Sequence, residues 1–194
     1  GLDQLDEYIG MGKIKSRVEE IVFQIEMALK NPGLGSPCIH MRFVGNPGTG
    51  KTTVARVIGK ILKERGILRK GNFFEHAGRD FCGRFVGETA PKTAAMCRDA
   101  YGSVLFIDEA YSLAGDRFGN NECIEVLLTA MEEHKSDTVF IFAGYVSEMQ
   151  DFMASNPGIQ SRIGYTFHFE DYSPEELTDM YAEKMKKTGF VVSE

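Results

Sequence analysis

The chain has 194 residues, of which 43% are hydrophobic, and its 22 basic and 28 acidic side chains give a net charge of −6. This length and apolar content suffice for one domain with a substantial core. The acidic balance, without a dense Lys/Arg run, makes nucleic acid an unlikely main partner. The four cysteines are scattered without a C-x-x-C pair, and no apolar run resembles a membrane span. We therefore expect a soluble, intracellular protein with reduced thiols, cytoplasmic unless a targeting segment was removed.

The first half of the chain alternates helix and strand patterns. Apolar residues at three- and four-residue spacings between Ile14 and Leu29 predict a helix that ends at Asn31-Pro32-Gly33. Residues 39–44 predict a strand, 51–65 a helix capped by Gly66, and 72–76 a short strand. Residues 77–87 are polar and interrupted by glycine, so we expect an irregular connection there.

The second half continues the alternation. It predicts helices over 88–101, 122–134, 147–154 and 173–187, and strands over 103–107, 138–143 and 165–169. The strands 103–107 and 138–143 are continuous apolar runs, which is typical of strands covered on both faces. The chain therefore predicts an α/β fold: a parallel five-stranded sheet with helices on both faces, whose ligands bind at the carboxyl ends of the strands.

Residues 45–52 read GNPGTGKT and match the pattern G-x-x-x-x-G-K-[ST] directly after the strand 39–44. In such a loop the glycines let backbone N–H groups turn toward phosphates, and a following helix adds its positive amino-terminal dipole. Lys51 supplies a charge for the phosphate oxygens and Thr52 a hydroxyl for Mg²⁺. A chance Gly/Pro turn is the alternative, but the strand before and the helix after the motif favour a phosphate-binding loop.

Asp108 and Glu109 follow the apolar strand 103–107. A Mg²⁺-dependent ATPase needs one acid near the metal and one to orient and deprotonate the attacking water, and these two residues suit those roles. Two solvated acids at a strand end are the alternative, which the matched phosphate loop disfavours. No N-K-x-D motif is present, so a GTPase is not expected.

Four motifs in order resemble one family. They are the phosphate loop with Thr53, residues 105–111 (LFIDEAY), residues 142–145 (FAGY) and residues 156–163 (NPGIQSRI). Together they are similar to the AAA+ ATPases of the CbbX/CfxQ group, the red-type Rubisco activases, and of stage V sporulation protein K. The resemblance implies ATP or ADP as nucleotide, Mg²⁺ as cofactor, and a hexameric ring that remodels or threads a protein client.

The resemblance also implies roles for single residues. Ile9 and Gly10 match the segment that holds adenine, and Arg162 matches an arginine finger that acts on the neighbouring subunit's nucleotide. Glu109 and Lys51 are the expected catalytic residues, and Tyr145 occupies a sensor position where relatives carry a polar residue, so it either senses or packs. The remaining residues expected to contact nucleotide or metal are Asn46, Pro47, Gly48, Thr49, Gly50, Thr52, Thr53 and Asp108.

Arg84, Phe85 and Val86 match a pore loop that grips a polypeptide in relatives. An aromatic side chain on a polar loop is suited to such contacts. The alternative is that Phe85 packs into the core.

The resemblance further implies a division of the chain. Residues 1–172 would form the AAA+ nucleotide-binding subdomain with its linker helix, and 173–194 the first helix of a truncated helical lid. Because the lid normally completes the pocket, we expect this chain to bind nucleotide weakly, to hydrolyse ATP weakly and to assemble poorly.

Two further functions stay open at this point. One is a regulatory or scaffold module that binds ATP but turns it over slowly, and the other is a motor directed at nucleic acid. Rubisco is one candidate client by family likeness, and sporulation or secretion targets are equally plausible.

Overall fold

The computed structural model describes residues 12–35, 37–85, 87–114 and 122–171. Five strands form a single sheet in the order β2-β3-β4-β1-β5, and every neighbouring pair is parallel. The predicted parallel five-stranded sheet is therefore confirmed. The strands are β1 (Met41–Val44), β2 (Phe73–Ala77), β3 (Val104–Asp108), β4 (Val139–Gly144) and β5 (Tyr165–His168).

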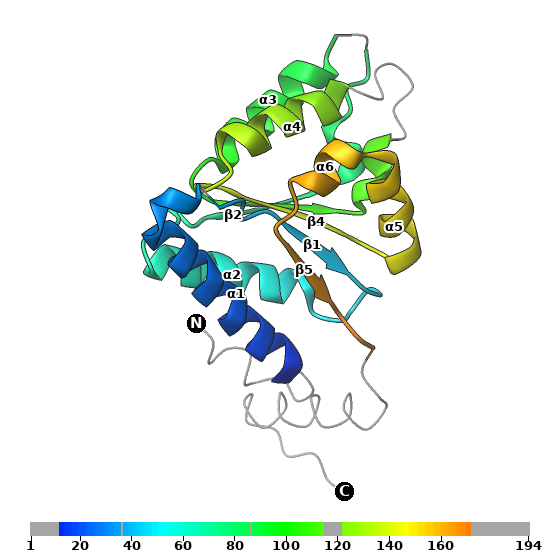
Figure 1. Cartoon of the computed structure of the whole chain (residues 1–194). Helices are drawn as coiled ribbons and strands as arrows, with labels where there is room; N and C mark the ends of the chain where they lie inside the picture. Colours follow the sequence, from blue (N-terminus) through cyan, green and yellow to red (C-terminus); the bar gives the residue numbers. More distant parts are fainter. Residues whose placement is uncertain (1–11, 36, 86, 115–121, 172–194) are drawn as a thin grey trace, which may run out of the picture.

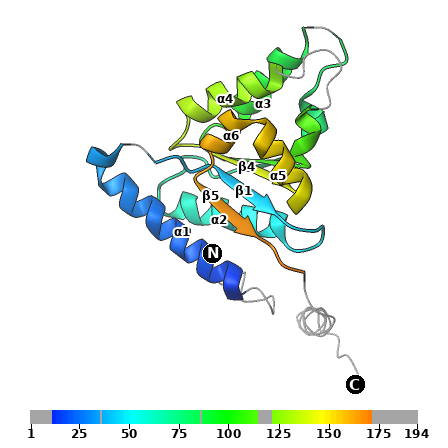
Figure 2. The same cartoon turned by 45° about the vertical axis from the view of Figure 1, so that its right-hand side comes forward.

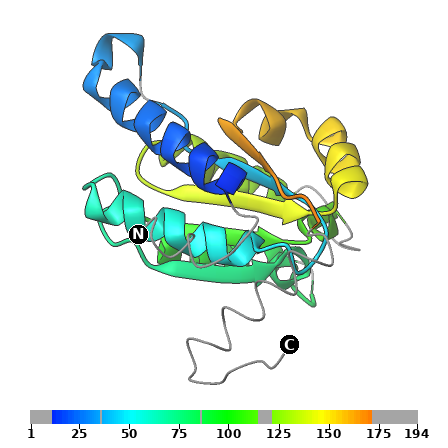
Figure 3. The ribbon, with the colours of Figure 1, turned by 90° about the horizontal axis from the view of Figure 1, so that it is seen from below.

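Helices cover both faces of the sheet, as predicted (Figure 1). On one face lie α1 and α2, which Figure 3 shows from below, and on the other lie α3 to α6. The helices are α1 (Gly12–Lys30), α2 (Lys51–Glu64), α3 (Thr89–Ala100), α4 (Glu122–Glu133), α5 (Val146–Ser155) and α6 (Pro157–Ser161). Three short 3-10 helices are η2 (Pro32–Leu34), η3 (Gly78–Phe81) and η4 (Ala110–Ala114).

The alternation of side chains along the central strands divides the core into two parts. Val104 and Phe106 of β3 join the cluster under α1 and α2, whereas Leu105 and Ile107 join the cluster under α3, α4 and α5. All four are fully buried, which explains why this strand is apolar at consecutive positions. On the α1 and α2 side, the ring of Phe43 lies 4.9 Å from that of Phe167.

Two short elements differ from the sequence-based expectation. Residues 157–161 form α6 and begin with Pro157 in the first turn, where its missing N–H costs nothing. The connection after β2 contains η3, whose start is fixed because the Ala77 N–H donates to the Asp80 carboxylate at 3.0 Å. Both elements span five residues or fewer, too few for a helical period to show in the sequence.

His40 is a fully buried polar residue just before β1. Its Nδ1 accepts the Phe140 N–H at 3.2 Å and its Nε2 donates to the Met131 carbonyl at 2.8 Å, an arrangement that requires the neutral ring. Burial lowers the pKa of His40 from 6.5 to about 4, although the hydrogen bond to the Met131 carbonyl and the charges of Asp137 and Glu132 act in the opposite direction. The ring therefore joins β1, β4 and α4 only while it is uncharged.

We predict that acid weakens the fold through His40. Between pH 6.5 and about 4 the unfolded chain binds a proton at this residue and the folded chain does not, so stability falls as pH falls through that window. From pH 7 to pH 5 the parent chain should lose about 2 kcal/mol more unfolding free energy than His40→Asn, measured by urea denaturation. Asn keeps a neutral acceptor for the Phe140 N–H and cannot titrate. Equal losses in the two proteins would show that His40 is not the acid-sensitive group.

Candidate functional site

The carboxyl ends of the parallel strands bring the predicted site residues to one edge of the sheet. The loop of residues 45–50 joins β1 to α2, Asp108 ends β3, and Tyr145 follows β4. β1 and β3 both flank β4, so the loop and the two acids emerge at the same edge, on either side of the end of β4. The structure thus collects three of the four sequence motifs at this edge (Figure 2), whereas the motif of residues 156–163 precedes β5.

The phosphate loop takes the backbone shape that its glycines allow. Gly50 has φ +96° and begins α2, and its carbonyl accepts the first helical bond from the Val54 N–H at 3.0 Å. A Cβ at Gly45 would lie 2.6 Å from the Phe169 carbonyl oxygen, so only glycine fits beside the segment after β5. The Thr49 hydroxyl donates to the Asn46 carbonyl at 2.7 Å and braces the turn.

Lys51 is the cation nearest to the loop backbone. Its Nζ donates to the Gly45 carbonyl at 2.6 Å, and burial lowers its pKa while the negative charge of Asp108 counteracts this effect. The ammonium also lies 5.9 Å from the centre of the Tyr145 ring. A phosphate oxygen would offer Nζ an ionic partner in place of a neutral carbonyl, which is a stronger hydrogen bond.

Asp108 and Glu109 are adjacent in sequence but differ in conformation. Glu109 has φ +48°, a region that residues with a side chain seldom adopt. The Asp108 Oδ1 accepts the Glu109 N–H at 2.9 Å, and the Glu109 carbonyl accepts the Ser112 hydroxyl at 2.7 Å. These bonds hold a strained turn, and such strain is characteristic of functional sites. Asp108 acts electrostatically on Lys51, whereas the Glu109 carboxylate meets a different cation.

That cation is Arg79, which the sequence did not indicate as a site residue. Its Nη1 lies 3.3 Å from Glu109 Oε2, and it belongs to η3, the element between β2 and the predicted pore loop. η3 also packs closely on the turn after Glu109, because a Cβ at Gly78 would lie 2.7 Å from the Glu109 carbonyl oxygen. The segment that leads to residues 84–86 is therefore in direct contact with the predicted catalytic acid.

A second contact that the sequence did not reveal joins the loop to the end of β5. The Asn46 amide donates to both carboxylate oxygens of Asp171, at 3.0 and 2.9 Å. The Phe169 N–H donates to the Val44 carbonyl at 2.8 Å, which aligns this segment with the loop. The segment that follows β5 thus holds the first residues of the phosphate loop.

Tyr145 lies at the site and starts α5. Its ring is 38% exposed and stacks beside that of Tyr111, with 6.4 Å between ring centres. Its place near Lys51 is consistent with the predicted sensor position, but the ring contact also satisfies the packing alternative.

Arg162 lies at the end of α6, and none of its hydrogen bonds or ion pairs within the described ranges reaches the phosphate loop. Its Nη1 donates to the Gly158 carbonyl at 2.9 Å, and its Nε lies 3.4 Å from Glu132 Oε2 of α4. The side chain is 30% exposed and Glu132 is 57% exposed, so this pair contributes little to stability.

Phe85 lies on the loop between η3 and α3 and is 69% exposed, which argues against the alternative that it packs into the core. The N–H groups of Arg84 and Phe85 both donate to the Glu88 carboxylate, at 2.9 and 3.2 Å. Glu88 thereby fixes the backbone that presents the ring. Val86, Ile9, Gly10 and residues 173–194 lie outside the described residues.

The oxygen donors at the site suit a hard divalent cation. A hydroxyl on Thr52 and a carboxylate on Asp108 are ligand types that Mg²⁺ accepts, with nucleotide phosphates and water completing its shell. Within the described ranges, no group of three or more His, Cys, Asp or Glu residues is placed to hold a metal without such a ligand. Within the same residues, no helix is long and apolar enough to cross a membrane.

Comparison with proteins of known sequence identifies close relatives. The chain is 46% identical over 187 residues to the chloroplastic ribulose bisphosphate carboxylase/oxygenase activase of Cyanidioschyzon merolae, covering 92% of this chain and 61% of that protein. It is 44% identical over 187 residues to the protein CbbX of Cereibacter sphaeroides, covering 92% of this chain and 60% of CbbX. The chain thus spans about three fifths of the length of these relatives.

Solved structures share the fold at lower identity. The AAA domain of FIGL-1 in complex with ADP matches with a TM-score of 0.64 and 20% identity, covering 92% of this chain and 59% of that one. A mutant of RuvB from Thermotoga maritima matches with a TM-score of 0.62 and 24% identity, covering 95% of this chain and 54% of that one.

A family model supports the same assignment. Residues 41–170, from β1 to the segment after β5, match the model of the ATPase family associated with various cellular activities. With the strand order, the phosphate loop and the relatives at 44–46% identity, this match shows that the chain belongs to the AAA family of ATPases, in the CbbX/CfxQ group.

Proposed function

We propose that this ATPase hydrolyses Mg²⁺-bound ATP at residues 45–53, Asp108 and Glu109, and that it does so in a ring that remodels a protein client. The main support is the placement of the two acids. Asp108 acts on the half-buried Lys51 beside the phosphate loop, and Glu109 presents a separate carboxylate at the same edge. These are the charges that metal-assisted phosphoryl transfer to water requires.

Binding would use the loop backbone and its side chains. The N–H groups at the start of α2 and the ammonium of Lys51 would hold the phosphates, and Thr52 with Asp108 would hold Mg²⁺. Bound Mg²⁺ would neutralise charge on the phosphates. We assign the adenine to Ile9 and Gly10 on the family resemblance.

Glu109 is proposed as the general base for the attacking water. Its Oε2 lies 3.3 Å from Arg79 Nη1, so in this structure that oxygen faces the arginine and not a water molecule. We propose that the Arg79–Glu109 pair opens before this oxygen takes the proton of the attacking water. Because η3 carries Arg79 and precedes residues 84–86, movement of that loop would alter the same pair.

Arg162 is proposed to act in trans as an arginine finger. Its guanidinium is partly exposed, and its partners among the described residues are the Gly158 carbonyl and the exposed Glu132, so release costs little. A guanidinium from the neighbouring subunit would stabilise charge on the γ-phosphate, and turnover would then depend on assembly, which we propose is a hexamer.

Phe85 is proposed to contact the client. The ring is mostly exposed, on a loop fixed by Glu88, and an exposed aromatic on a positioned loop can grip apolar segments. One relative is named as an activase of ribulose bisphosphate carboxylase/oxygenase, which makes that enzyme one candidate client.

A slow ATP-binding scaffold is the second candidate function. The contacts that hold Lys51, Glu109 and Arg162 within their own chain favour it for the unassembled state. Glu109→Gln separates the two functions: it should abolish the output of a motor and leave that of a scaffold unchanged.

We predict that two inactive variants complement each other. Under conditions in which the parent protein assembles, Arg162→Ala should lose at least about 10³-fold in turnover, and Glu109→Gln about 10² to 10⁴-fold. An equal mixture should recover about a quarter of the parent rate. In a randomly mixed ring, half of the sites have an intact Glu109, and half of these face an intact Arg162 from the neighbouring subunit.

The control is Lys51→Ala, which should not bind nucleotide, whereas both variants above should retain binding in a fluorescent-ADP assay. If the mixture hydrolyses ATP no faster than the two variants measured separately, Arg162 does not act across a subunit interface.

We predict that Arg79→Ala raises basal ATP turnover by about two- to fivefold at saturating ATP, because an exposed ion pair of about 0.5–1 kcal/mol no longer restrains Glu109. Arg98→Ala, which removes an exposed arginine from α3, serves as the matched control. Steady-state phosphate release measures both. Unchanged or slower turnover in Arg79→Ala would mean that the pair does not restrain the base.

We predict that Phe85→Ala separates hydrolysis from client action. Its ATP turnover without client should stay within about twofold of the parent, since the ring is not in the nucleotide site, but stimulation by a client should be lost. Phe85→Tyr keeps the aromatic ring and should therefore retain stimulation by the client. The measurement is ATP turnover with added Rubisco or unfolded casein. The gripping role would be contradicted if the clients still stimulate Phe85→Ala. It would also be contradicted if neither Rubisco nor casein stimulates the parent protein.

A further inference from the structure

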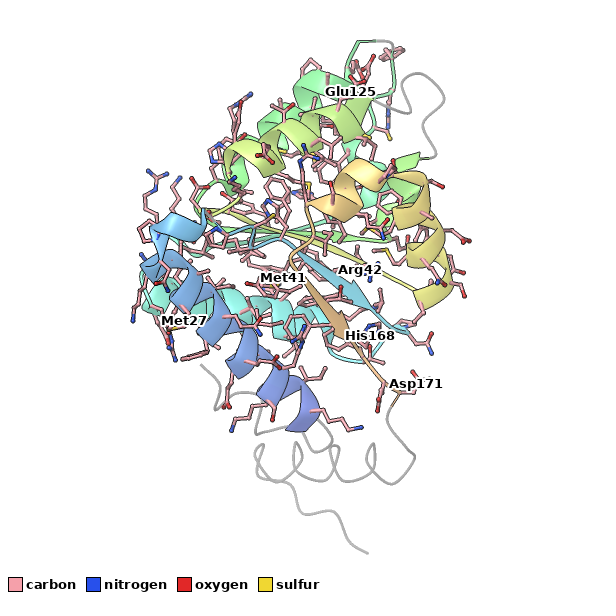
Figure 4. The ribbon with its side chains drawn as sticks, viewed as in Figure 1. Met27, Met41, Arg42, Glu125, His168 and Asp171 are labelled. Atoms are coloured by element: carbon pink, nitrogen blue, oxygen red, sulfur yellow. The ribbon has the colours of Figure 1, made fainter. Side chains whose placement is uncertain are left out.

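A cleft lies on the sheet face opposite α1 and α2, between the helices α5 and α6 and the strands β1 and β5 (Figure 4). Its volume is about 450 Å³, which is in the range of small-molecule sites. The strands contribute Arg42, Val44 and His168, and the helices contribute Gln150, Met153 and Gln160. The described functional residues of the phosphate loop are not among its walls.

Arg42 is the unusual member of this cleft. It occupies a central position on β1, where its neighbours Met41 and Phe43 are fully buried on the other face. Its Nε is buried, and none of the described residues accepts a hydrogen bond from it. No ion pair with a described carboxylate neutralises its guanidinium either. An N–H removed from water without an acceptor is destabilising, so the position has a cost that packing alone does not explain.

The other groups around Arg42 have complementary chemistry. Val44 is in register with His168, so both side chains stand on the Arg42 face of the sheet, and Figure 4 shows Arg42 and His168 on adjacent strands. Gln150 and Gln160 add amide donors at the exposed rim, whereas Val44 and Met153 form buried apolar walls. Among the residues that the structure describes, no acidic side chain lines the cleft.

We propose that this cleft binds a small organic carboxylate. Its carboxylate would accept from the Arg42 guanidinium, and its aliphatic part would lie against Val44 and Met153. One guanidinium balances one negative charge, so a monocarboxylate fits these apolar walls better than a phosphate dianion does. Because Val44 directly precedes Gly45, an occupant would touch the strand that carries the phosphate loop.

The test is calorimetric titration of the 194-residue chain with sodium pentanoate, in a buffer free of other carboxylates. Inorganic phosphate and the uncharged pentanamide serve as comparison ligands. Pentanoate should bind more tightly than pentanamide, and Arg42→Gln should weaken its binding roughly tenfold or more while leaving phosphate binding at the phosphate loop unchanged. Arg56→Gln, which removes an arginine of α2 that contacts the ring of Phe73, should leave the affinity unchanged.

Gln150→Glu provides a second variant that does not disturb the core, because Gln150 is exposed. It places a negative charge at the cleft and should also weaken pentanoate binding. The proposal is overturned if pentanoate shows no binding below about 10 mM, if Arg42→Gln and Gln150→Glu bind it as the parent does, or if Arg42→Gln abolishes phosphate binding that is tighter than that of pentanoate.

Discussion

The interaction on which the site depends is the parallel pairing of β4 with both β1 and β3. Met41 pairs with Ile141 and Phe106 pairs with the same residue from the other side, so the ends of β1 and β3 lie within one residue of each other along β4. Lys51 and Asp108 therefore lie close enough for the charge of one to affect the pKa of the other, although 57 positions separate them in sequence. A one-residue slip would turn every side chain of β3 to the opposite face and move Asp108 away from the loop. The buried aromatic and aliphatic side chains on both faces prevent that slip, so the core determines the geometry of the site.

The sequence was informative where the signal is local. Apolar spacing gave the order of strands and helices, and the phosphate loop follows from eight consecutive residues whose backbone demands are well understood. Periodicity failed for α6 and η3 because each is shorter than two helical turns. The contacts of Arg79 with Glu109 and of Asn46 with Asp171 join residues 30 and 125 positions apart, and no local pattern encodes which polar side chains meet across such distances. Arg42 was missed for a similar reason: an arginine within a strand signals nothing until the fold shows that its Nε has no acceptor among the described residues.

The charged groups proposed for catalysis each have a partner within their own chain. Lys51 bonds to the Gly45 carbonyl, Glu109 to Arg79, and Arg162 to Gly158 and Glu132. Each of these partners is either a neutral carbonyl or an exposed charge, and such contacts contribute little free energy because water competes for them. Nucleotide phosphates and a neighbouring subunit would supply partners of opposite charge in a less hydrated setting, where the same groups interact more strongly. Under the proposed function, the exchange of partners would therefore be favourable without large changes in the core, and it would couple nucleotide binding to assembly.

Under the proposed function, the position of Arg79 would extend this coupling to the predicted pore loop, residues 84–86. Gly78 and Arg79 contact the turn that carries Glu109, and a few residues later Glu88 holds the backbone on which Phe85 is displayed. η3 is a single short turn, and only a few residues separate Arg79 from Phe85. A displacement of Phe85 would therefore also move Arg79. Under the proposed function, force on residues 84–86 and proton transfer at Glu109 would therefore act on opposite ends of the same short segment. Under the proposed function, a client that pulls on Phe85 would change how firmly Arg79 holds the base, and hydrolysis would in turn change how firmly the loop is held.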